Sequence, residues 1–334
     1  MLNFAVIGFG YWGPNIVRNL AGIKDARVKM ICDRDPLALQ RAKSLYPHIE
    51  CTSHIDDVFK SNQIDIVAII TPVSTHFEIA KKALEYGKYI FVEKPFTATS
   101  QQAQTLISSA RKKNLIIMVD HTFLFTGAVR KIKELMVKKT LGDLHYYDST
   151  RVSLGLFQHD VNVIWDLAPH DFSILDYIVN EKPTALTAQG MDHFGAGQEN
   201  IAYITLYFKS RFIAHINVNW LSPVKVRTTL IAGQKRMLVW DDLETDEKIK
   251  LYDKGVKVQN KESLYQMLID YRSGDMWSPR VKYGEALSVE LNYLVHCIKK
   301  NKIPLNDGES GLRVVQLLEA SDKSLKNKGK LIKL

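Results

Sequence analysis

The sequence lacks most of the features that mark secreted, metal-stapled and membrane proteins. It holds three cysteines, Cys32, Cys51 and Cys297, and no pair of them has a Cys-x-x-Cys spacing. This odd, scattered set argues against a disulfide framework and against a zinc site, and it favours a reducing compartment. No stretch approaches the roughly 20 apolar residues of a membrane span, and the N-terminus has no signal-peptide pattern. We expect a cytoplasmic protein with no metal and no membrane partner.

Positively charged residues are in modest excess. The chain carries 45 Lys and Arg against 36 Asp and Glu, a formal net charge of +9. The basic residues form neither a basic helix nor an RNA-binding motif, so nucleic acid is not an expected partner. A basic surface would still attract anionic small molecules such as sugar nucleotides. The length of 334 residues suits two domains.

The first part of the chain alternates apolar runs with amphipathic stretches, which predicts strand–helix–strand units. The runs are rich in Val and Ile with little alternation, as in parallel strands buried on both faces. We predict an α/β fold in which residues 1–121 form a Rossmann domain with a doubly wound parallel sheet. The expected strands are 3–7, 27–32, 64–70, 89–92 and 116–119, with helices at 75–86 and 101–113 among them.

After residue 121 the pattern changes to consecutive alternating strands with short links. This predicts a second, α+β domain over 122–334, with a large, mostly antiparallel, open-faced sheet that serves substrate binding. The expected elements are strands 203–208, 212–220, 227–232 and 237–240, and helices 127–138, 284–299 and 310–326. The last two helices are expected to pack back on the first domain. Residues 253–283 are polar and irregular, so a long loop is expected there.

A glycine-rich turn follows the first strand. Gly8, Gly10 and Gly13 form a Gly-x-Gly-x-x-Gly pattern, and Asp33 ends the second strand 20 residues further on. Gly8 permits the turn, Gly10 lets the backbone approach a pyrophosphate, and Gly13 allows close helix packing, while the helix N-terminus offers N–H groups to phosphates. Asp33 would bind ribose hydroxyls and repel a 2′-phosphate, so NAD is favoured over NADP. Arg34 favours NADP instead, because an arginine at this position can pair with the 2′-phosphate.

Two further motifs contain candidate catalytic residues. Glu93-Lys94-Pro95 ends a strand, and ligands of open α/β sheets bind at that end; alone, Lys94 is equally a surface lysine at a loop start. Asp166 and His170 lie four residues apart, on one face of a helix over 162–179. By themselves they are equally a capping Asp and a satisfied buried His.

These motifs together resemble the glucose–fructose oxidoreductase, inositol dehydrogenase and MocA (Gfo/Idh/MocA) family. The resemblance covers essentially the whole chain. It also includes the stretch from Thr71 to His76 and the run that begins at Asp307 with Asp-Gly-Glu-Ser-Gly. It implies that the Lys94–Pro95 peptide bond is cis, and that the sheet of the second domain forms a homodimer or homotetramer.

The resemblance also implies roles for particular residues. Lys94, Asp166 and His170 would form the catalytic group. The residues implied or inferred to bind the cofactor are Gly8, Gly10, Tyr11, Trp12, Gly13, Asp33, Arg34, Thr71, Pro72, His76, Glu93, Lys94 and His121. The candidates for binding substrate are Lys94, Arg151, Trp165, Asp166, His170, Lys225 and Arg227. Three of them, Arg151, Lys225 and Arg227, are cations suited to binding a diphosphate. They are equally explained as ordinary surface charge on strands.

The sequences of three stretches are similar to those of the nucleotide-sugar branch of the family. These stretches are residues 160–171, 119–123 and 220–227. Members of that branch oxidise a ring hydroxyl of a UDP-N-acetyl sugar, typically at C3, ahead of a transamination. The expected function is therefore that of an NAD-dependent sugar dehydrogenase in polysaccharide biosynthesis, with an aminotransferase acting next. Two alternatives stand: a dehydrogenase of a free sugar or inositol, and a non-catalytic NAD-binding regulator.

Oxidation of a secondary alcohol requires a hydride acceptor and a proton acceptor. His170 suits the second role because the ordinary pKa of histidine lies near neutrality, and Asp166 would orient its ring. Lys94 is the other candidate, because the cationic cofactor would favour its neutral amine. The sequence leaves these two assignments open.

Overall fold

The computed structural model describes residues 1–155, 158, 160–257 and 270–334. Contacts divide the chain into two compact units. The first comprises Met1–Phe125 and Gly284–Glu319, and the second Thr126–Tyr283 and Ala320–Leu334. The expected boundary after residue 121 lies four residues before this division. In the part of the chain that the structure describes, no helix is long and apolar enough to cross a membrane.

The first unit contains a six-stranded parallel sheet in the order β3-β2-β1-β4-β5-β6, which confirms the predicted doubly wound sheet. Its central strand β4 is buried at every position, as expected where helices cover both faces. Since all the strands are parallel, their carboxyl ends share one edge. The strands are β1 (Leu2–Ile7), β2 (Ala26–Cys32), β3 (Glu50–Thr52), β4 (Ile66–Ile69), β5 (Tyr89–Glu93) and β6 (Ile117–Asp120).

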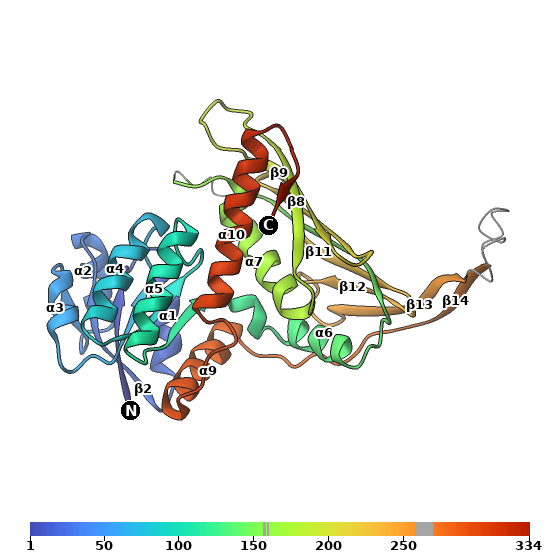
Figure 1. Ribbon diagram of the computed structural model, residues 1–334. Helices are drawn as coiled ribbons and strands as arrows, with labels where there is room; N and C mark the ends of the chain where they lie inside the picture. The colour runs from blue at the N-terminus through green and yellow to red at the C-terminus, as the bar shows by residue number, and fades with distance from the viewer. Residues whose placement is uncertain (156–157, 159, 258–269) are drawn as a thin grey trace. The chain divides into compact units, whose positions relative to one another are not determined.

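Helices pack on this sheet in two groups. Helix α1 contacts β2 and α9, whereas α4 and α5 contact each other (Figure 1). Glu285, just before α9, accepts hydrogen bonds from Arg18 and Asn19 of α1, so a segment from late in the chain completes this unit. The helices are α1 (Gly13–Ala21), α2 (Pro36–Leu45), α3 (Ile55–Lys60), α4 (Val73–Glu85), α5 (Ser100–Lys112), the 3-10 helix η1 (Thr122–Phe125) and α9 (Ala286–Lys300).

The second unit contains a sheet of nine strands among the described residues, in the order β14-β13-β12-β11-β7-β10-β9-β8-β15. The pairing of β7 with β10 is parallel, and the other described pairs are antiparallel. The strands are β7 (Leu144–Leu154), β8 (Pro183–Met191), β9 (Ile201–Phe208), β10 (Ile213–Asn219), β11 (Leu221–Gly233), β12 (Met237–Asp241), β13 (Ile249–Lys257), β14 (Asp270–Trp277) and β15 (Ile332–Lys333).

One face of this sheet carries the core of the second unit. Helix α7 (Val163–Ile178) packs on β9 and β10 and against α6 (Gly127–Val137) (Figure 1). Along β10, Ala214, Ile216 and Val218 are fully buried, while the residues between them are partly exposed. This alternation is that of a sheet with one covered face. Helix α10 (Gly308–Lys326) begins in the first unit and ends in the second.

The expected loop over 253–283 is wrong for the described residues, because β13 and β14 pair there as antiparallel strands. Arg272 Nε donates to Asp253 Oδ1 at 2.9 Å across the pair. Most side chains of residues 272–276 are exposed on both faces, so they show no alternation of apolar and polar residues, and that alternation is the sequence signal of a strand. Residues 258–269 lie outside the described residues.

Candidate cofactor site and catalytic residues

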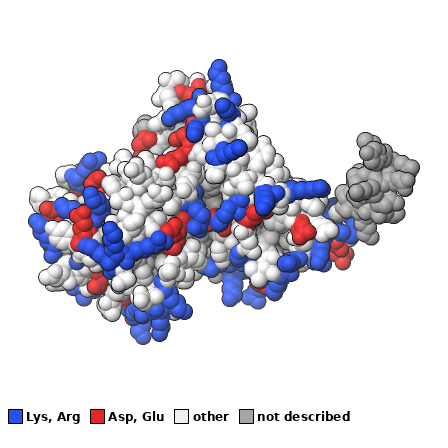
Figure 2. All heavy atoms as spheres, viewed as in Figure 1, with Lys and Arg blue, Asp and Glu red and all other residues white. Residues whose placement is uncertain are grey.

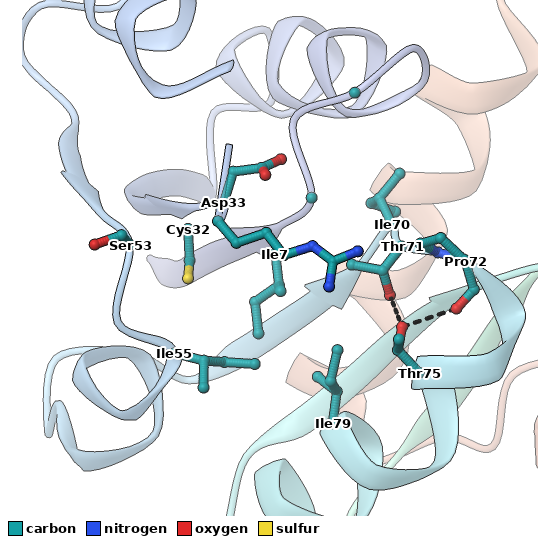
Figure 3. A pocket seen from close by; sticks show the side chains of 13 residues that line it. Ile7, Cys32, Asp33, Ser53, Ile55, Ile70, Thr71, Pro72, Thr75 and Ile79 are labelled. Carbon is teal, nitrogen blue, oxygen red and sulfur yellow. Dashed lines mark hydrogen bonds between the residues drawn. The ribbon is translucent and has the colours of Figure 1, made fainter. Parts of the chain in front are cut away.

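A cavity of about 430 Å³ lies where β1, β2 and β4 end, at the switch in strand order (Figure 3). Ligands of open α/β sheets bind at this position. Its lining includes Gly8, Gly10, Asp33, Thr71 and Pro72. Arg34 lines it as well, so six residues that sequence reasoning placed at the cofactor line one cavity.

The three glycines of the turn do different things. Gly8 has a φ of +99°, and a Cβ there would lie 2.2 Å from the carbonyl oxygen of Ile70. A Cβ on Gly13 would lie 2.3 Å from the carbonyl oxygen of Gly8. Gly10 differs, because no atom lies within 4 Å of the position of its Cβ. Gly8 and Gly13 are therefore required by the fold itself, whereas Gly10 borders open space.

The start of α1 is suited to a phosphate. Trp12 occupies the N-cap, no side chain caps the helix, and Pro14 follows in the first turn. Uncapped N–H groups at a helix N-terminus, with the helix dipole behind them, bind anions. Together with the open space at Gly10, this geometry fits the pyrophosphate of a dinucleotide.

Asp33 is held in place at the rim of the cavity. Its Oδ2 accepts the backbone N–H of Phe9 at 2.6 Å, and its Oδ1 accepts that of Asp35 at 2.9 Å. A fixed carboxylate at the end of β2 is the group that binds ribose hydroxyls. Burial and the charge of Asp33 raise the pKa of the neighbouring Cys32 thiol to about 11, so Cys32 stays neutral. Sequence reasoning missed Arg41, whose guanidinium donates to the carbonyl oxygens of Phe9 and Gly10.

The loops after β4 and β5 are tied together. His76 is 1% exposed, and its ring nitrogens lie 2.7 Å from the carbonyl oxygen of Thr71 and 2.9 Å from that of Pro95. Thr75, another residue that sequence reasoning missed, donates from its hydroxyl to Thr71 Oγ1 or to the carbonyl oxygen of Pro72 (Figure 3). His76 thus holds two loops of the site in register.

The strand ends on the other side of β4 bring Lys94 beside β6. Glu93 pairs with Asp120 in the sheet register, and the half-buried Lys94 follows Glu93. The Lys94–Pro95 peptide bond is cis, as the family resemblance implied. Trp12 Nε1 donates to Asp120 Oδ2 at 3.3 Å, which joins the glycine turn to β6. Tyr11 is 87% exposed and His121 is 1% exposed.

In the second unit, α7 carries Asp166 and His170 one turn apart, as expected. Both side chains are half-buried. Trp220 Nε1 donates to Asp166 Oδ2 at 3.1 Å. Trp165 Nε1 donates to Asp322 Oδ2 at 2.8 Å, so Trp165 anchors α7 to the end of α10. These contacts hold the helix that presents the Asp–His pair.

Asp171, which sequence reasoning did not single out, anchors the same helix to the sheet. It is fully buried, its Oδ1 accepts Ser149 Oγ at 2.6 Å, and its Oδ2 accepts Arg151 Nε at 2.8 Å. Arg151 is itself only 5% exposed. This burial makes Arg151 the partner of a buried carboxylate and does not favour it as a ligand for a substrate diphosphate.

The other two cationic candidates lie on β11. Lys225 is exposed, and Arg227 Nη1 lies 3.5 Å from Asp242 Oδ2. Burial and the nearby Arg151 lower the pKa of Arg227. Lys94 belongs to the first unit and Asp166 and His170 to the second, so their meeting in one catalytic group stays a prediction.

The fold and the cofactor site define the class of the protein. Residues 2–121 match the model of the oxidoreductase family with an NAD-binding Rossmann fold, and residues 129–239 match the Gfo/Idh/MocA C-terminal domain. The chain belongs to the Gfo/Idh/MocA family of NAD-binding oxidoreductases, which confirms the resemblance inferred from the motifs.

Three relatives illustrate its place in the family. The chain is 24% identical to a scyllo-inositol 2-dehydrogenase (NAD(+)) of Bacillus subtilis, over 90% of this chain and 87% of the relative. It is 23% identical to a UDP-N-acetylglucosamine 3-dehydrogenase of Acidithiobacillus ferrooxidans over 93% of both chains. The structure of that enzyme matches with a TM-score of 0.81 over 98% of both chains, at 21% identity. An Agrobacterium radiobacter oxidoreductase solved with NAD+ matches with a TM-score of 0.83, 16% identity and coverage of 99% of this chain and 98% of the other.

Proposed function

We propose that the protein oxidises a ring hydroxyl, at C3, of a UDP-N-acetyl amino sugar to the keto sugar, as a UDP-N-acetylglucosamine 3-dehydrogenase does. The observation that carries the proposal is similarity to such an enzyme along 93% of both chains. It is joined by the sequence of residues 160–171, which resembles the nucleotide-sugar branch and includes the first turns of α7 with His170. The product would be a ketone, suited to an aminotransferase as the next enzyme.

Each of the proposed catalytic residues has its own task. His170 takes the hydroxyl proton as general base, and Asp166, held by Trp220, orients the ring and stabilises the imidazolium. Lys94 hydrogen-bonds the same hydroxyl, and it is the alternative base. Bound NAD supplies the hydride acceptor. The meeting of these groups around one carbon is part of the proposal.

The nucleotide is recognised by cations on the second-unit sheet. Lys225 is exposed on β11, and Arg227 adds a guanidinium two residues further along the strand. On the face drawn in Figure 2, Lys and Arg are interspersed with Asp and Glu rather than gathered into one stripe. That distribution suits local pairing with a small anion better than tracking along a nucleic acid backbone.

A dehydrogenase of a free sugar or inositol is the second candidate. It is favoured by similarity to the scyllo-inositol 2-dehydrogenase over 90% of this chain. A non-catalytic NAD-binding regulator is a weaker candidate, because a regulator has no need of Lys94, Asp166 and His170 together.

Ligand-dependent thermal stabilisation in the presence of NAD separates the first two. We expect UDP-N-acetylglucosamine and UDP to raise the melting temperature, and Lys225→Gln to reduce both shifts. Free N-acetylglucosamine and myo-inositol should have little effect. A shift with myo-inositol and none with UDP would replace the proposal with the second candidate. NADH formation at high pH would exclude the regulator.

We also propose that the uncovered face of the second-unit sheet forms a homodimer or homotetramer. Tyr203, Tyr207 and Ile213 lie on that face and are 44%, 38% and 40% exposed, and the Tyr203 ring stacks on His215 with centroids 6.2 Å apart. Exposed aromatic and aliphatic side chains gathered on one face are typical of an interface. Light scattering should give the mass of two or four chains; the mass of one chain would contradict this.

A further inference from the structure

Arg41, on α2, contacts the glycine turn and belongs to no motif found in the sequence. Its Nη2 donates to the carbonyl oxygen of Phe9 at 2.5 Å and to that of Gly10 at 3.2 Å. Its guanidinium also lies over the Phe9 ring, 5.6 Å from the ring centroid. That ring is fully buried and makes an edge contact with Tyr46, the residue that follows α2. The guanidinium is therefore fixed against the turn, although Arg41 lies at the surface.

The backbone of Phe9 is held from two sides. Asp33 Oδ2 accepts the N–H of Phe9 at 2.6 Å, and Arg41 donates to the carbonyl oxygen of the same residue. Asp33 is itself fixed by the N–H of Asp35. Two charged side chains, one after β2 and one on α2, thus restrict the conformation of the turn. Binding to a backbone that is already ordered avoids the entropic cost of ordering it.

The geometry of the peptide group shows what the Arg41 contact does. The carbonyl of Phe9 shares one planar peptide group with the N–H of Gly10, and the carbonyl of Gly10 shares one with the N–H of Tyr11. In a trans peptide the C=O and N–H point in opposite directions. Both carbonyls converge on one nitrogen of Arg41, so both N–H groups are turned away from it. Within the described part of the chain, no protein acceptor takes a hydrogen bond from either N–H.

We propose that Arg41 is a positioning residue of the cofactor site: by holding the Phe9 and Gly10 carbonyls, it aims the N–H groups of Gly10 and Tyr11 at the pyrophosphate of the dinucleotide. Successive backbone N–H groups that point the same way form an anion-binding concavity. Gly10 lines the cofactor cavity, and no described atom lies within 4 Å of its Cβ position, so an anion has room to approach. This role concerns NAD binding and holds whichever alcohol is oxidised.

Binding of cofactor fragments tests the role. Arg41→Met removes both hydrogen bonds to the turn and keeps an unbranched side chain. In NMR titrations the Kd for NAD+ and for ADP-ribose should rise at least tenfold, while the Kd for adenosine, which has no phosphate, should stay within about twofold. Lys43→Met removes the same charge from an exposed position of the same helix, and it should leave all three values within about twofold.

Three results of these titrations would overturn the proposal. The first is unchanged NAD+ affinity in Arg41→Met. The second is an equal loss in Lys43→Met, which would make the effect one of general charge. The third is an equal loss for adenosine, which would make Arg41 a direct contact of the ribose or adenine. None of these measurements needs turnover, so a failure of the proposed sugar oxidation leaves them unaffected.

A readout without cofactor separates positioning from a direct contact with the phosphates. In the ligand-free protein, 15N relaxation should give lower order parameters for Gly10 and Tyr11 in Arg41→Met than in the wild type or in Lys43→Met. Unchanged order parameters, even with weakened NAD binding, would overturn the positioning role. If Arg41→Met does not fold, Arg41→Gln, whose shorter side chain cannot reach both carbonyls, replaces it in both measurements with the same expected results.

Discussion

The glycine turn of the first unit and helix α7 of the second are built by different means. At the turn, the backbone makes the site: Gly8 and Gly13 allow close approach, and the uncapped start of α1 offers its N–H groups. On α7, side chains from elsewhere in the second unit hold the helix, through Arg151 to Asp171 and Trp220 to Asp166. A site formed by the backbone therefore tolerates almost no change in its glycines. A site held by side chains depends instead on partners far away in the chain.

The largest effect is expected at the proposed proton acceptors. His170→Asn and Lys94→Ala should each lower turnover by about 10²–10⁴-fold, the usual cost of losing a general base. Asp166→Asn should lose less, because its role is orientation. Cofactor affinity, measured by fluorescence quenching, should change little in all three. Near-normal turnover in both of the first two variants would reject the catalytic group.

The glycines of the turn should separate cofactor binding from folding. Gly10→Val places its side chain in open space where the pyrophosphate must approach, so NAD affinity should fall more than tenfold while the melting temperature is retained. Gly8→Val is the contrasting variant, since its Cβ would meet the carbonyl of Ile70 and the protein should fail to fold. An affinity change below about threefold in Gly10→Val, under 1 kcal/mol, would place the cofactor elsewhere.

The ion pair of Asp171 and Arg151, which anchors α7 to the sheet, should contribute to stability. Arg151→Met leaves the buried Asp171 without its ion-pair partner, which costs about 3–5 kcal/mol, roughly 10 °C in Tm for a unit of this size. Adding Asp171→Leu, which removes the buried charge, should restore part of the loss. Unchanged Tm with an increased KM for the UDP-sugar would instead make Arg151 the diphosphate ligand inferred from the sequence.

Glu290, which is fully buried in α9, predicts a smaller, pH-dependent effect in the first unit. The pKa of Glu290 is raised by folding, so its contribution to stability is greatest below its ordinary pKa, near 4.3, and is lost as pH rises toward the folded value. Glu290→Gln does not titrate. The free energy of unfolding of this variant relative to wild type should therefore increase from pH 4.5 to pH 7, by at most about 1.4 kcal/mol per pH unit, and its relative Tm should rise with it. Parallel Tm curves would contradict a protonated Glu290.

The features of the fold and site that sequence could predict are those set by local spacing. Gly8, Gly10, Gly13 and Asp33 lie at fixed sequence spacings around one strand–turn–helix unit. Their roles can therefore be inferred without knowing which distant residues they contact. The strand β14 was missed because its described residues are mostly exposed on both faces and show no alternation. Asp171 and Glu290 were missed for a different reason: each is a single polar residue whose partner lies in another element, and nothing in their local sequence marks the burial.

Isotope transfer tests the central claim, the oxidation of a UDP-amino-sugar ring carbon at an NAD site. UDP-N-acetylglucosamine deuterated at C3 is incubated with the protein and NAD+, and the nicotinamide is analysed by mass spectrometry. Deuterium should appear in the reduced cofactor with wild-type protein and with Glu290→Gln, and should be strongly reduced with His170→Asn. No transfer from this sugar, together with transfer from myo-inositol deuterated at the oxidised carbon, would contradict the claim.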